Sequence, residues 1–158
     1  PLAVAHCYLF GGNGLKLDNK KAFDMLVKIE KETKGYHWAQ VMLGECYQYG
    51  YGVGKDAKKR FEYHSLSAEQ GNSLAMVSLG YCYEKGKGTD ANLTKAFEWY
   101  EKSANLGCSN AMYNVGMFYK NGKGEVTKDK KEARKWLTNA AAQCHTSAQT
   151  ALNKIGKN

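Results

Sequence analysis

The sequence of 158 residues predicts an all-α solenoid, built from antiparallel helix-turn-helix units, on three observations. First, one segment recurs every 36 residues, at 39–50, 75–86 and 111–122. A fixed period of this length is typical of a stacked array rather than of one globular core. Second, the only proline is Pro1, so helices can run uninterrupted. Third, glycines recur at the boundaries of the repeats, where helices end.

The first helix of each unit is predicted over residues 39–49 and the two later copies of that segment. Each copy is followed by a glycine, as a left-handed C-cap favours: Gly50, Gly86 and Gly122. Each copy also contains an interior glycine: Gly44, Gly80 and Gly116. An interior glycine costs about 1 kcal/mol relative to alanine, so its recurrence predicts a close approach by the second helix. We expect one aliphatic and one tyrosine per copy to fill the core: Leu43, Tyr47, Leu79, Tyr83, Val115 and Tyr119.

The second helix of each unit is predicted to begin at a polar N-cap, whose side-chain oxygen accepts a free backbone N–H: Asp56, Asn92 and Asp129. It ends near an alanine in each copy: Ala68, Ala104 and Ala141. Gly71 and Gly107 stop the first two copies, and Cys144 replaces this glycine in the last. Arg60 stands where the other copies have alanine, and we expect its charged end to reach solvent or to displace the first helix.

An earlier and a later copy extend the array at both ends. Gly12, Gly14 and Asp18 match Gly50, Gly52 and Asp56 at a spacing of 38, and the helix that follows is predicted over residues 22–34. The predicted repeats are 1–38, 39–74, 75–110 and 111–147, followed by a partial capping helix over 148–156. Because the chain starts inside a repeat, we expect it to be a fragment of a larger protein.

The pattern A-x-x-x-L-G-x-x-Y-x-x-G, followed by D-x-x-K-A and A-x-x-G, resembles the Sel-one-like repeat (SLR) family, a relative of the tetratricopeptide arrays. The resemblance covers nearly the whole chain. It implies a right-handed superhelix of antiparallel helix pairs that acts as a non-catalytic adaptor, as a regulatory, signalling or assembly module. A secreted, cysteine-rich branch of the family has two cysteines about eight residues apart in each repeat, a spacing that this chain lacks.

The five cysteines are expected to be free thiols. Cys46 and Cys82 share a register in consecutive repeats, and neighbouring helix axes lie about 8–10 Å apart, beyond the reach of a disulfide. Free thiols favour a cytoplasmic protein. The chain has no C-x-x-C pair, so we expect no metal site, and no cofactor. It also has no apolar run long enough to span a membrane.

In tetratricopeptide arrays the first helix of each pair lines the concave face, and by this analogy we predict a groove that holds a partner peptide. Spacings of i, i+3, i+7 and i+10 place each set of residues on one face of its helix. The predicted groove residues are Trp38, Val41, Glu45, Gln48 and Tyr49 in the second repeat, Leu74, Val77, Tyr81, Glu84 and Lys85 in the third, and Asn110, Tyr113, Met117, Lys120 and Asn121 in the fourth. The alternative is that Val41, Val77 and Met117 only complete the packing between neighbouring helices.

The net charge of +8 is concentrated in two clusters, which we call the basic edge. Its residues are Lys55, Lys58, Lys59, Arg60, Lys128, Lys130, Lys131, Arg134 and Lys135. Cations at the start of a helix interact unfavourably with its dipole, which favours a functional reason for these residues. The alternatives are a solvated surface, common in this family, or a site for an acidic protein, an anionic membrane surface or RNA.

Two other classes of function are disfavoured. An RNA-reading array needs a regular polar code, and the equivalent positions Glu45, Tyr81 and Met117 show none, so we do not expect nucleic acid. For an enzyme, the four histidines recur at no common register, and no phosphate-binding loop is present. The prediction is therefore a scaffold for a protein or peptide partner, and pairing of two copies through the terminal repeats stays open.

Overall fold

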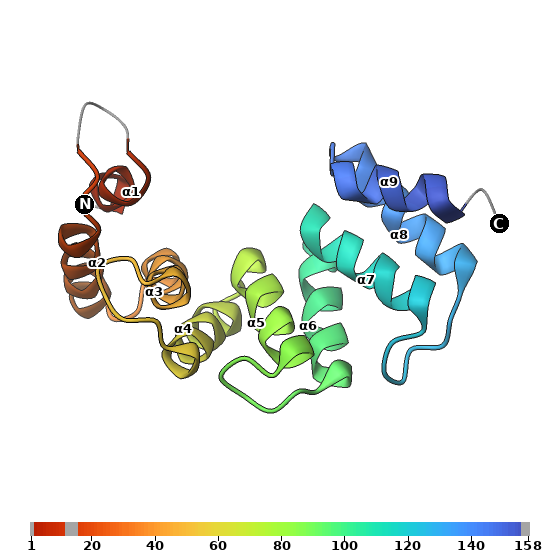
Figure 1. The fold of residues 1–158 in the computed structure, drawn as a ribbon, viewed down its shortest axis with the longest axis horizontal. Helices are drawn as coiled ribbons and strands as arrows, with labels where there is room; N and C mark the ends of the chain where they lie inside the picture. Colours follow the sequence, from red (N-terminus) through yellow and green to blue (C-terminus); the bar gives the residue numbers. More distant parts are fainter. Residues whose placement is uncertain (1, 12–15, 156–158) are drawn as a thin grey trace. The chain divides into compact units, whose positions relative to one another are not determined.

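In a computed structural model, the described residues, 2–11 and 16–155, form nine α-helices and no strand. The helices are α1 (Leu2–Phe10), α2 (Asn19–Glu32), α3 (His37–Tyr49), α4 (Ala57–Glu69), α5 (Ser73–Lys85), α6 (Leu93–Asn105), α7 (Ser109–Asn121), α8 (Lys130–Ala142) and α9 (Thr146–Ile155). Short loops join them, so that consecutive helices such as α1 and α2, α3 and α4, or α7 and α8 pack side by side (Figure 1).

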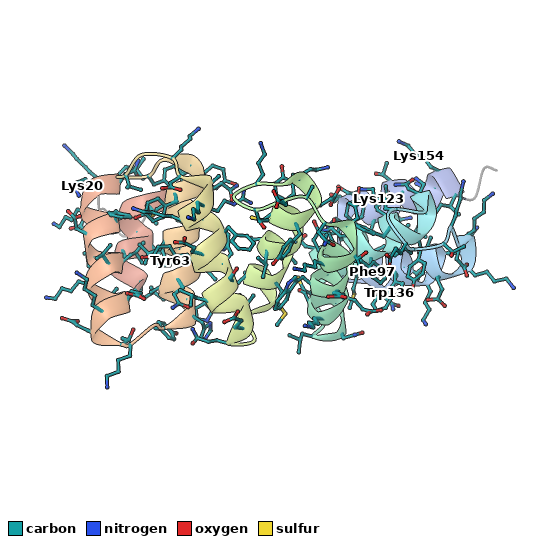
Figure 2. The ribbon with its side chains drawn as sticks, turned by 90° about the horizontal axis from the view of Figure 1, so that it is seen from below. Lys20, Tyr63, Phe97, Lys123, Trp136 and Lys154 are labelled. Atoms are coloured by element: carbon teal, nitrogen blue, oxygen red, sulfur yellow. The ribbon has the colours of Figure 1, made fainter. Side chains whose placement is uncertain are left out.

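The chain divides into two compact units. The first ends at Ala75 and includes Lys87–Thr89, and the second comprises Met76–Gly86 and continues from Asp90. A core in the first unit contains Ala5, Leu9, Ala22, Leu26, Met42, Leu43 and Cys46. Two cores in the second contain Ala96, Tyr100, Ala104, Ala111, Val115 and Phe118, and Ala133, Leu137, Ala140, Ala148, Ala151 and Ile155. In Figure 2, Phe97 lies among the helices, whereas Lys20 and Lys154 extend away from them.

The predicted caps are confirmed. The side chains of Asp56 and Asn92 accept hydrogen bonds from the backbone N–H of Lys59 and Lys95, at 3.0 and 2.9 Å. Gly50 and Gly122 end α3 and α7 in the left-handed conformation. Helix α3 begins at His37, two residues before the predicted start.

The end of α1 shifts the register predicted for the first repeat. The N–H of Gly11, with φ of +77°, donates to the carbonyl of Cys7, as Gly50 donates to Cys46. Gly11 is therefore the equivalent of Gly50, at a spacing of 39 rather than 38. Gly12 and Gly14, used for the predicted match, lie outside the described residues.

The interior glycines mark the predicted close approach of the paired helices. A Cβ atom on Gly80 would lie 2.7 Å from Cε1 of Tyr100, and one on Gly116 would lie 2.7 Å from Cγ of Leu137. The same atom on Gly44 would lie 2.6 Å from Cε1 of His64. Because real Cβ contacts are never this short, each glycine leaves the space that one side chain of the following helix occupies.

The second glycine of each loop has a packing role that the sequence did not indicate. A Cβ on Gly52 would meet the backbone of Asn19 at the start of α2, and one on Gly88 would meet Ala57 at the start of α4. A Cβ on Gly124 would lie 2.8 Å from Cβ of Leu93, at the start of α6. Each loop thus lies directly against the second helix of the preceding repeat.

Candidate partner-binding site

We call the first helix of each repeat its A helix, here α1 and α3. The first unit contains a hollow of about 500 Å³ on the face of its A helices, which we call the α1–α3 hollow. It is lined by Leu2, Ala3, His6, Phe10, Trp38, Val41, Met42, Glu45 and Leu74. Four of these residues belong to the predicted groove: Trp38, Val41, Glu45 and Leu74. The helical spacing explains why they meet, because positions 38, 41 and 45 lie on one face of α3.

The rest of the lining is Met42 of α3 and four residues of α1, a helix that sequence analysis did not assign to the groove. Leu2, His6 and Phe10 recur at intervals of four residues on one face of this helix. With Gly11 as the equivalent of Gly50, His6 corresponds to Glu45 and Phe10 to Tyr49. Phe10 could have been identified by extending the predicted groove to the first repeat, because it also aligns with Gln48 at the predicted spacing of 38. Leu2 and His6 align with groove positions only in the register that Gly11 sets.

Several predicted groove residues are exposed although they are large and apolar. Trp38, Leu74 and Tyr81 each expose about two fifths of their surface, at 40, 42 and 41%. Tyr49 is also exposed, whereas Val41 is buried, with only 6% exposed at the base of the hollow. Exposed aromatic side chains of this kind are common anchors in protein interfaces.

The remaining predicted groove residues are less uniform. Gln48, Val77, Tyr113, Met117 and Lys120 are half-buried, and Asn110 and Asn121 are exposed. Tyr113 stacks on His145, with ring centroids 4.8 Å apart, and both Tyr113 and Met117 pack against the core of α8 and α9. These two side chains therefore have a packing role.

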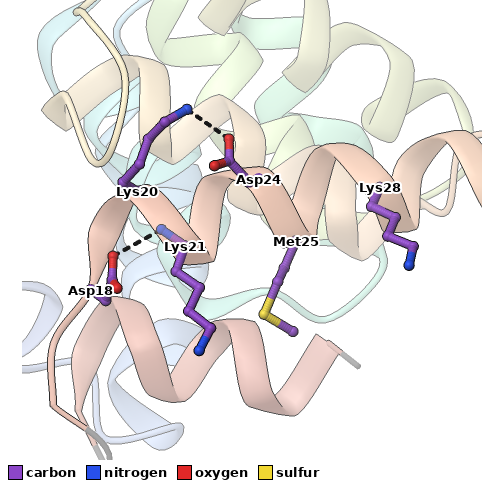
Figure 3. A pocket seen from close by; sticks show the side chains of 6 residues that line it. All are labelled: Asp18, Lys20, Lys21, Asp24, Met25 and Lys28. Carbon is purple, nitrogen blue, oxygen red and sulfur yellow. Dashed lines mark hydrogen bonds and ion pairs between the residues drawn. The ribbon is translucent and has the colours of Figure 1, made fainter.

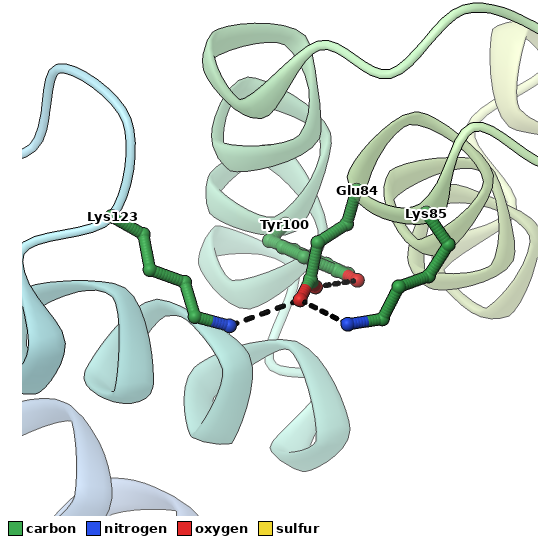
Figure 4. A network of polar contacts seen from close by, with 4 residues as sticks. All are labelled: Glu84, Lys85, Tyr100 and Lys123. Carbon is green, nitrogen blue, oxygen red and sulfur yellow. Dashed lines mark hydrogen bonds and ion pairs between the residues drawn. The ribbon is translucent and has the colours of Figure 1, made fainter.

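Glu84 and Lys85 are tied into a polar network in the second unit (Figure 4). Tyr100 donates a hydrogen bond to Glu84 at 3.1 Å, and Lys85 and Lys123 form ion pairs with it at 3.0 and 2.9 Å. Burial by itself would raise the pKa of Glu84, but the hydrogen bonds from Lys123, Lys85 and Tyr100 outweigh it, so the pKa is lowered overall. The network joins the end of α5 to α6 and to the loop before α8.

The pKa of Glu45 is shifted in the opposite direction from that of Glu84. Glu45 is half-buried in the α1–α3 hollow, and burial raises the pKa of its carboxyl group. The charge of His6 opposes this rise only in part. Among the described residues, no cation lies within 4 Å of the Glu45 carboxylate.

The α8 part of the basic edge forms one surface. Lys130, Lys131, Arg134 and Lys135 line a shallow hollow of about 500 Å³ along the exposed side of α8. Lys135 is paired with Glu132 at 3.6 Å, and Lys128 is exposed in the preceding loop. Positions 130 and 134, and positions 131 and 135, are four residues apart, and 131 and 134 are three apart, so these side chains are neighbours on one side of the helix.

The other part of the basic edge departs from the prediction. Arg60 is buried, with only 8% of its surface exposed, because it occupies the inward register held by alanine in the other repeats. Lys59 lies over the ring of Tyr47, at 5.1 Å from its centroid, and Lys95 lies over Tyr83 in the same way. Only Lys55 and Lys58 remain as exposed cations of this cluster with no such contact described.

A further charged hollow, of about 400 Å³, lies on α2 and was not predicted (Figure 3). Asp18 caps the helix by accepting from the N–H of Lys21, and Lys20 pairs with Asp24 at 2.7 Å. The Lys21 ammonium lies 4.6 Å from the centroid of the Tyr8 ring on α1. Its charges are therefore mostly satisfied by local partners, which favours a structural role.

Within residues 2–11 and 16–155, no three histidine, cysteine, aspartate or glutamate side chains are grouped so as to hold a metal ion. In the same part of the chain, none of the helices combines the length and apolar character needed to cross a bilayer. None of the five cysteines forms a disulfide, and burial raises the pKa of the Cys46 thiol to about 12.

Comparisons with solved structures agree with the helical-solenoid prediction. The protective antigen c5321 of uropathogenic Escherichia coli, which displays an SLR fold, is 33% identical over 97% of this chain, with a TM-score of 0.88. A Sel1 repeat protein from Oxalobacter formigenes is 31% identical over 97% of this chain, also with a TM-score of 0.88. This chain spans 32% and 61% of the lengths of those two proteins.

A third similar structure is cysteine rich protein B of Helicobacter pylori, which is 28% identical over 90% of this chain and 100% of its own length, with a TM-score of 0.63. A search of curated protein sequences gave no match. The family model of the Sel1 repeat matches four times, at residues 2–28, 39–72, 73–108 and 109–143. The chain therefore belongs to the Sel1 repeat family, whose repeats are generally non-catalytic modules for protein–protein interaction.

Proposed function

We propose that this chain is a non-catalytic scaffold that binds a partner protein or peptide on the face of its A helices, as a regulatory or assembly module of a larger protein. The observation that carries the proposal is the α1–α3 hollow, a cavity of about 500 Å³ with the exposed apolar side chains Phe10, Trp38 and Leu74 at its rim. Hollows that combine apolar walls with few polar groups are the usual setting for a bound side chain.

The corresponding face of α5 supports the same proposal within the second unit. Tyr81 is 41% exposed at the register that Glu45 occupies on α3. When a partner covers a solvent-exposed aromatic side chain, the complex is stabilised by roughly 25 cal/mol for each Å² of apolar surface buried. Tyr113 and Met117 contribute less, because they are already packed.

The proposal is tested by affinity capture from lysate with the full chain, followed by mass spectrometry. The test variant replaces Trp38 and Tyr81 by alanine, and a second adds Tyr113→Ala to complete the predicted groove. The matched control replaces Leu66 and Leu106, which are 46 and 60% exposed and lie outside the hollow and the predicted groove, by alanine. Far-UV circular dichroism verifies the fold of every variant.

We expect that some proteins are recovered with the wild type and with the control but not with the Trp38/Tyr81 variant. Those proteins are then tested for direct binding as purified components. Equal recovery by the wild type, the control and both test variants would refute the assignment of the site to the A helices.

A second candidate is an anionic partner on the exposed side of α8, supported by the four cations that line one hollow there. Reversing two of them, with Lys131→Glu and Arg134→Glu, is expected to abolish binding of such a partner. Affinity for RNA would fall steeply as salt rises, roughly in proportion to the number of phosphates contacted. Anionic vesicles and an acidic peptide serve as the other probes, and unchanged binding of all three by the variant would exclude this surface.

Two further expectations accompany the proposal. Buried thiols at Cys46 and Cys82 favour a reducing compartment such as the cytoplasm, where thiols stay reduced. Pairing of two copies through the terminal repeats is tested by light scattering across a range of protein concentrations.

A further inference from the structure

The α1–α3 hollow places one carboxylate among apolar and aromatic walls. Trp38, Phe10 and Leu74 form the exposed rim, and Val41 and Met42, which expose 6 and 7% of their surfaces, lie at its base. Among the described residues that line the hollow, Glu45 is the only acidic one. A carboxylate in such a setting is poorly solvated, which is the reason its pKa is raised.

The aromatic rim is held in place by neighbouring rings. The Phe10 ring lies 4.8 Å from the His6 ring and meets the edge of Tyr51 at 6.3 Å. The Trp38 ring lies 5.6 Å from His37, whose Nδ1 is 3.0 Å from the side-chain amide of Asn72. A rim that is already ordered loses little conformational entropy when a ligand binds.

We propose that this hollow takes an arginine side chain of the partner peptide, with its guanidinium on the Glu45 carboxylate and its flat face against the rings of Trp38 and Phe10. The inference rests on the proposed function, since it specifies the partner chemistry of the same site. A planar guanidinium can pair with a carboxylate through two parallel hydrogen bonds and can also stack on aromatic rings.

Other occupants fit these walls less well. A purely apolar side chain would cover Glu45 without supplying a partner, and burying an unpaired carboxylate is costly. An ammonium group lacks the planar face that stacks on the rim, and is more strongly hydrated. An acidic side chain would be repelled by Glu45 at close range.

The charge of the whole chain restricts the rest of the peptide. A net charge of +8 repels a polybasic segment, so the arginine must lie in a peptide whose other residues are apolar or acidic. The expected motif is a single arginine with apolar neighbours, which would contact the apolar lining residues Leu2 and Leu74.

The first experiment selects phage-displayed random peptides of about twelve residues on the immobilised full chain. Enrichment is compared for the wild type, Glu45→Gln and Glu45→Arg, with Glu69→Gln as a matched control, because Glu69 is an exposed carboxylate outside the hollow. We expect one arginine position to be enriched on the wild type and on the control. That enrichment should disappear on Glu45→Gln and be replaced by acidic residues on Glu45→Arg.

The second experiment measures the affinity of one selected peptide by fluorescence anisotropy. Replacement of its arginine by citrulline, which keeps the shape and removes the charge, is expected to weaken binding about tenfold or more, as is typical for a hydrogen-bonded charge. On Glu45→Gln the two peptides should bind with similar affinity, because the coupled pair is already lost.

Selected peptides without an arginine preference, or a citrulline peptide that binds as tightly as its parent, would overturn the inference. If binding of such peptides is still lost in the Trp38/Tyr81 alanine variant, the proposed function holds while the arginine assignment fails. If that variant binds them unchanged, both fail. Selection of no peptide above the bare support would also overturn the arginine assignment.

Discussion

Replacement of His64 by leucine is expected to stabilise the folded chain. It should also remove the loss of stability that His64 causes as the pH falls. His64 is completely buried on α4, over Gly44, and among the described residues neither ring nitrogen has a hydrogen-bond partner. The equivalent position in the fourth repeat is Leu137, which packs over Gly116. Leucine therefore suits both the space and the apolar surroundings.

The magnitude follows from the pKa of the imidazole. Burial, together with the charge of Arg60, lowers the pKa of His64 from 6.5 to about 4. Between these values the unfolded chain binds a proton that the folded chain does not, so the free energy of unfolding falls as the pH drops from 6.5 to 4. Each pKa unit corresponds to about 1.4 kcal/mol, which gives a total loss of about 3 kcal/mol. At neutral pH, leucine removes a buried unsatisfied polar group, a gain of about 1–3 kcal/mol.

The assay is urea denaturation followed by circular dichroism at several pH values between 4 and 7.5. Wild type, His64→Leu and the control His6→Gln are compared, since His6 is exposed. The difference between wild type and His64→Leu should grow by about 3 kcal/mol as the pH falls, whereas the control follows the wild type. Carboxylates contribute equally to wild type and His64→Leu and cancel in the difference between these two chains.

The reasoning would be refuted by parallel pH profiles for wild type and His64→Leu. A destabilised variant at neutral pH would also contradict it, because it would mean that the imidazole makes a favourable contact in the folded chain.

Three further substitutions test the packing of single residues. Gly80→Ala should lower the free energy of unfolding by about 1 kcal/mol. Overpacking against Tyr100 costs about 1–3 kcal/mol, which outweighs the gain of about 1 kcal/mol in helix propensity. A raised melting temperature would contradict this prediction. Cys144→Gly should stabilise by about 1 kcal/mol, since Cys144 has φ of +62°; an unchanged urea midpoint would argue against strain there. Glu84→Gln should lower the free energy of unfolding by about 1 kcal/mol at neutral pH, because it weakens the ion pair with Lys123, which is partly solvent-screened. If neither the wild type nor the variant changes its free energy of unfolding between 0.05 and 0.5 M salt, the pair contributes nothing.

Local features of the helices were predictable because they depend on nearby residues. The N-cap at Asn92 and the C-cap at Gly122 are set by backbone groups within a few residues, and both are confirmed. The repeat extended this reasoning to longer range: the interior glycine at position 80 recurs at a fixed register, which indicated a shared contact before Tyr100 was known as its partner.

The candidate site was predictable only in part. Trp38, Val41 and Glu45 share a helical face, so their common orientation followed from spacing. Phe10 was missed because the predicted groove was drawn only on the second, third and fourth repeats, although Phe10 aligns with Gln48 at a spacing of 38 and with Tyr49 at 39. Arg60 of the basic edge is buried, because position 60 lies on the side of α4 that faces the core.

By itself, the sequence determined the helix class, the repeat period, the caps and the positions where paired helices come close, since each reflects a preference repeated at one register. The tertiary structure decided which side chains from different helices meet. It brought His6 and Phe10 of α1 to Glu45 of α3, left that carboxylate half-buried with no cation within 4 Å in the described chain, and placed Lys59 over Tyr47. The physical reason is that solvation and pairing of a charged group depend on residues distant in sequence, which only packing brings together.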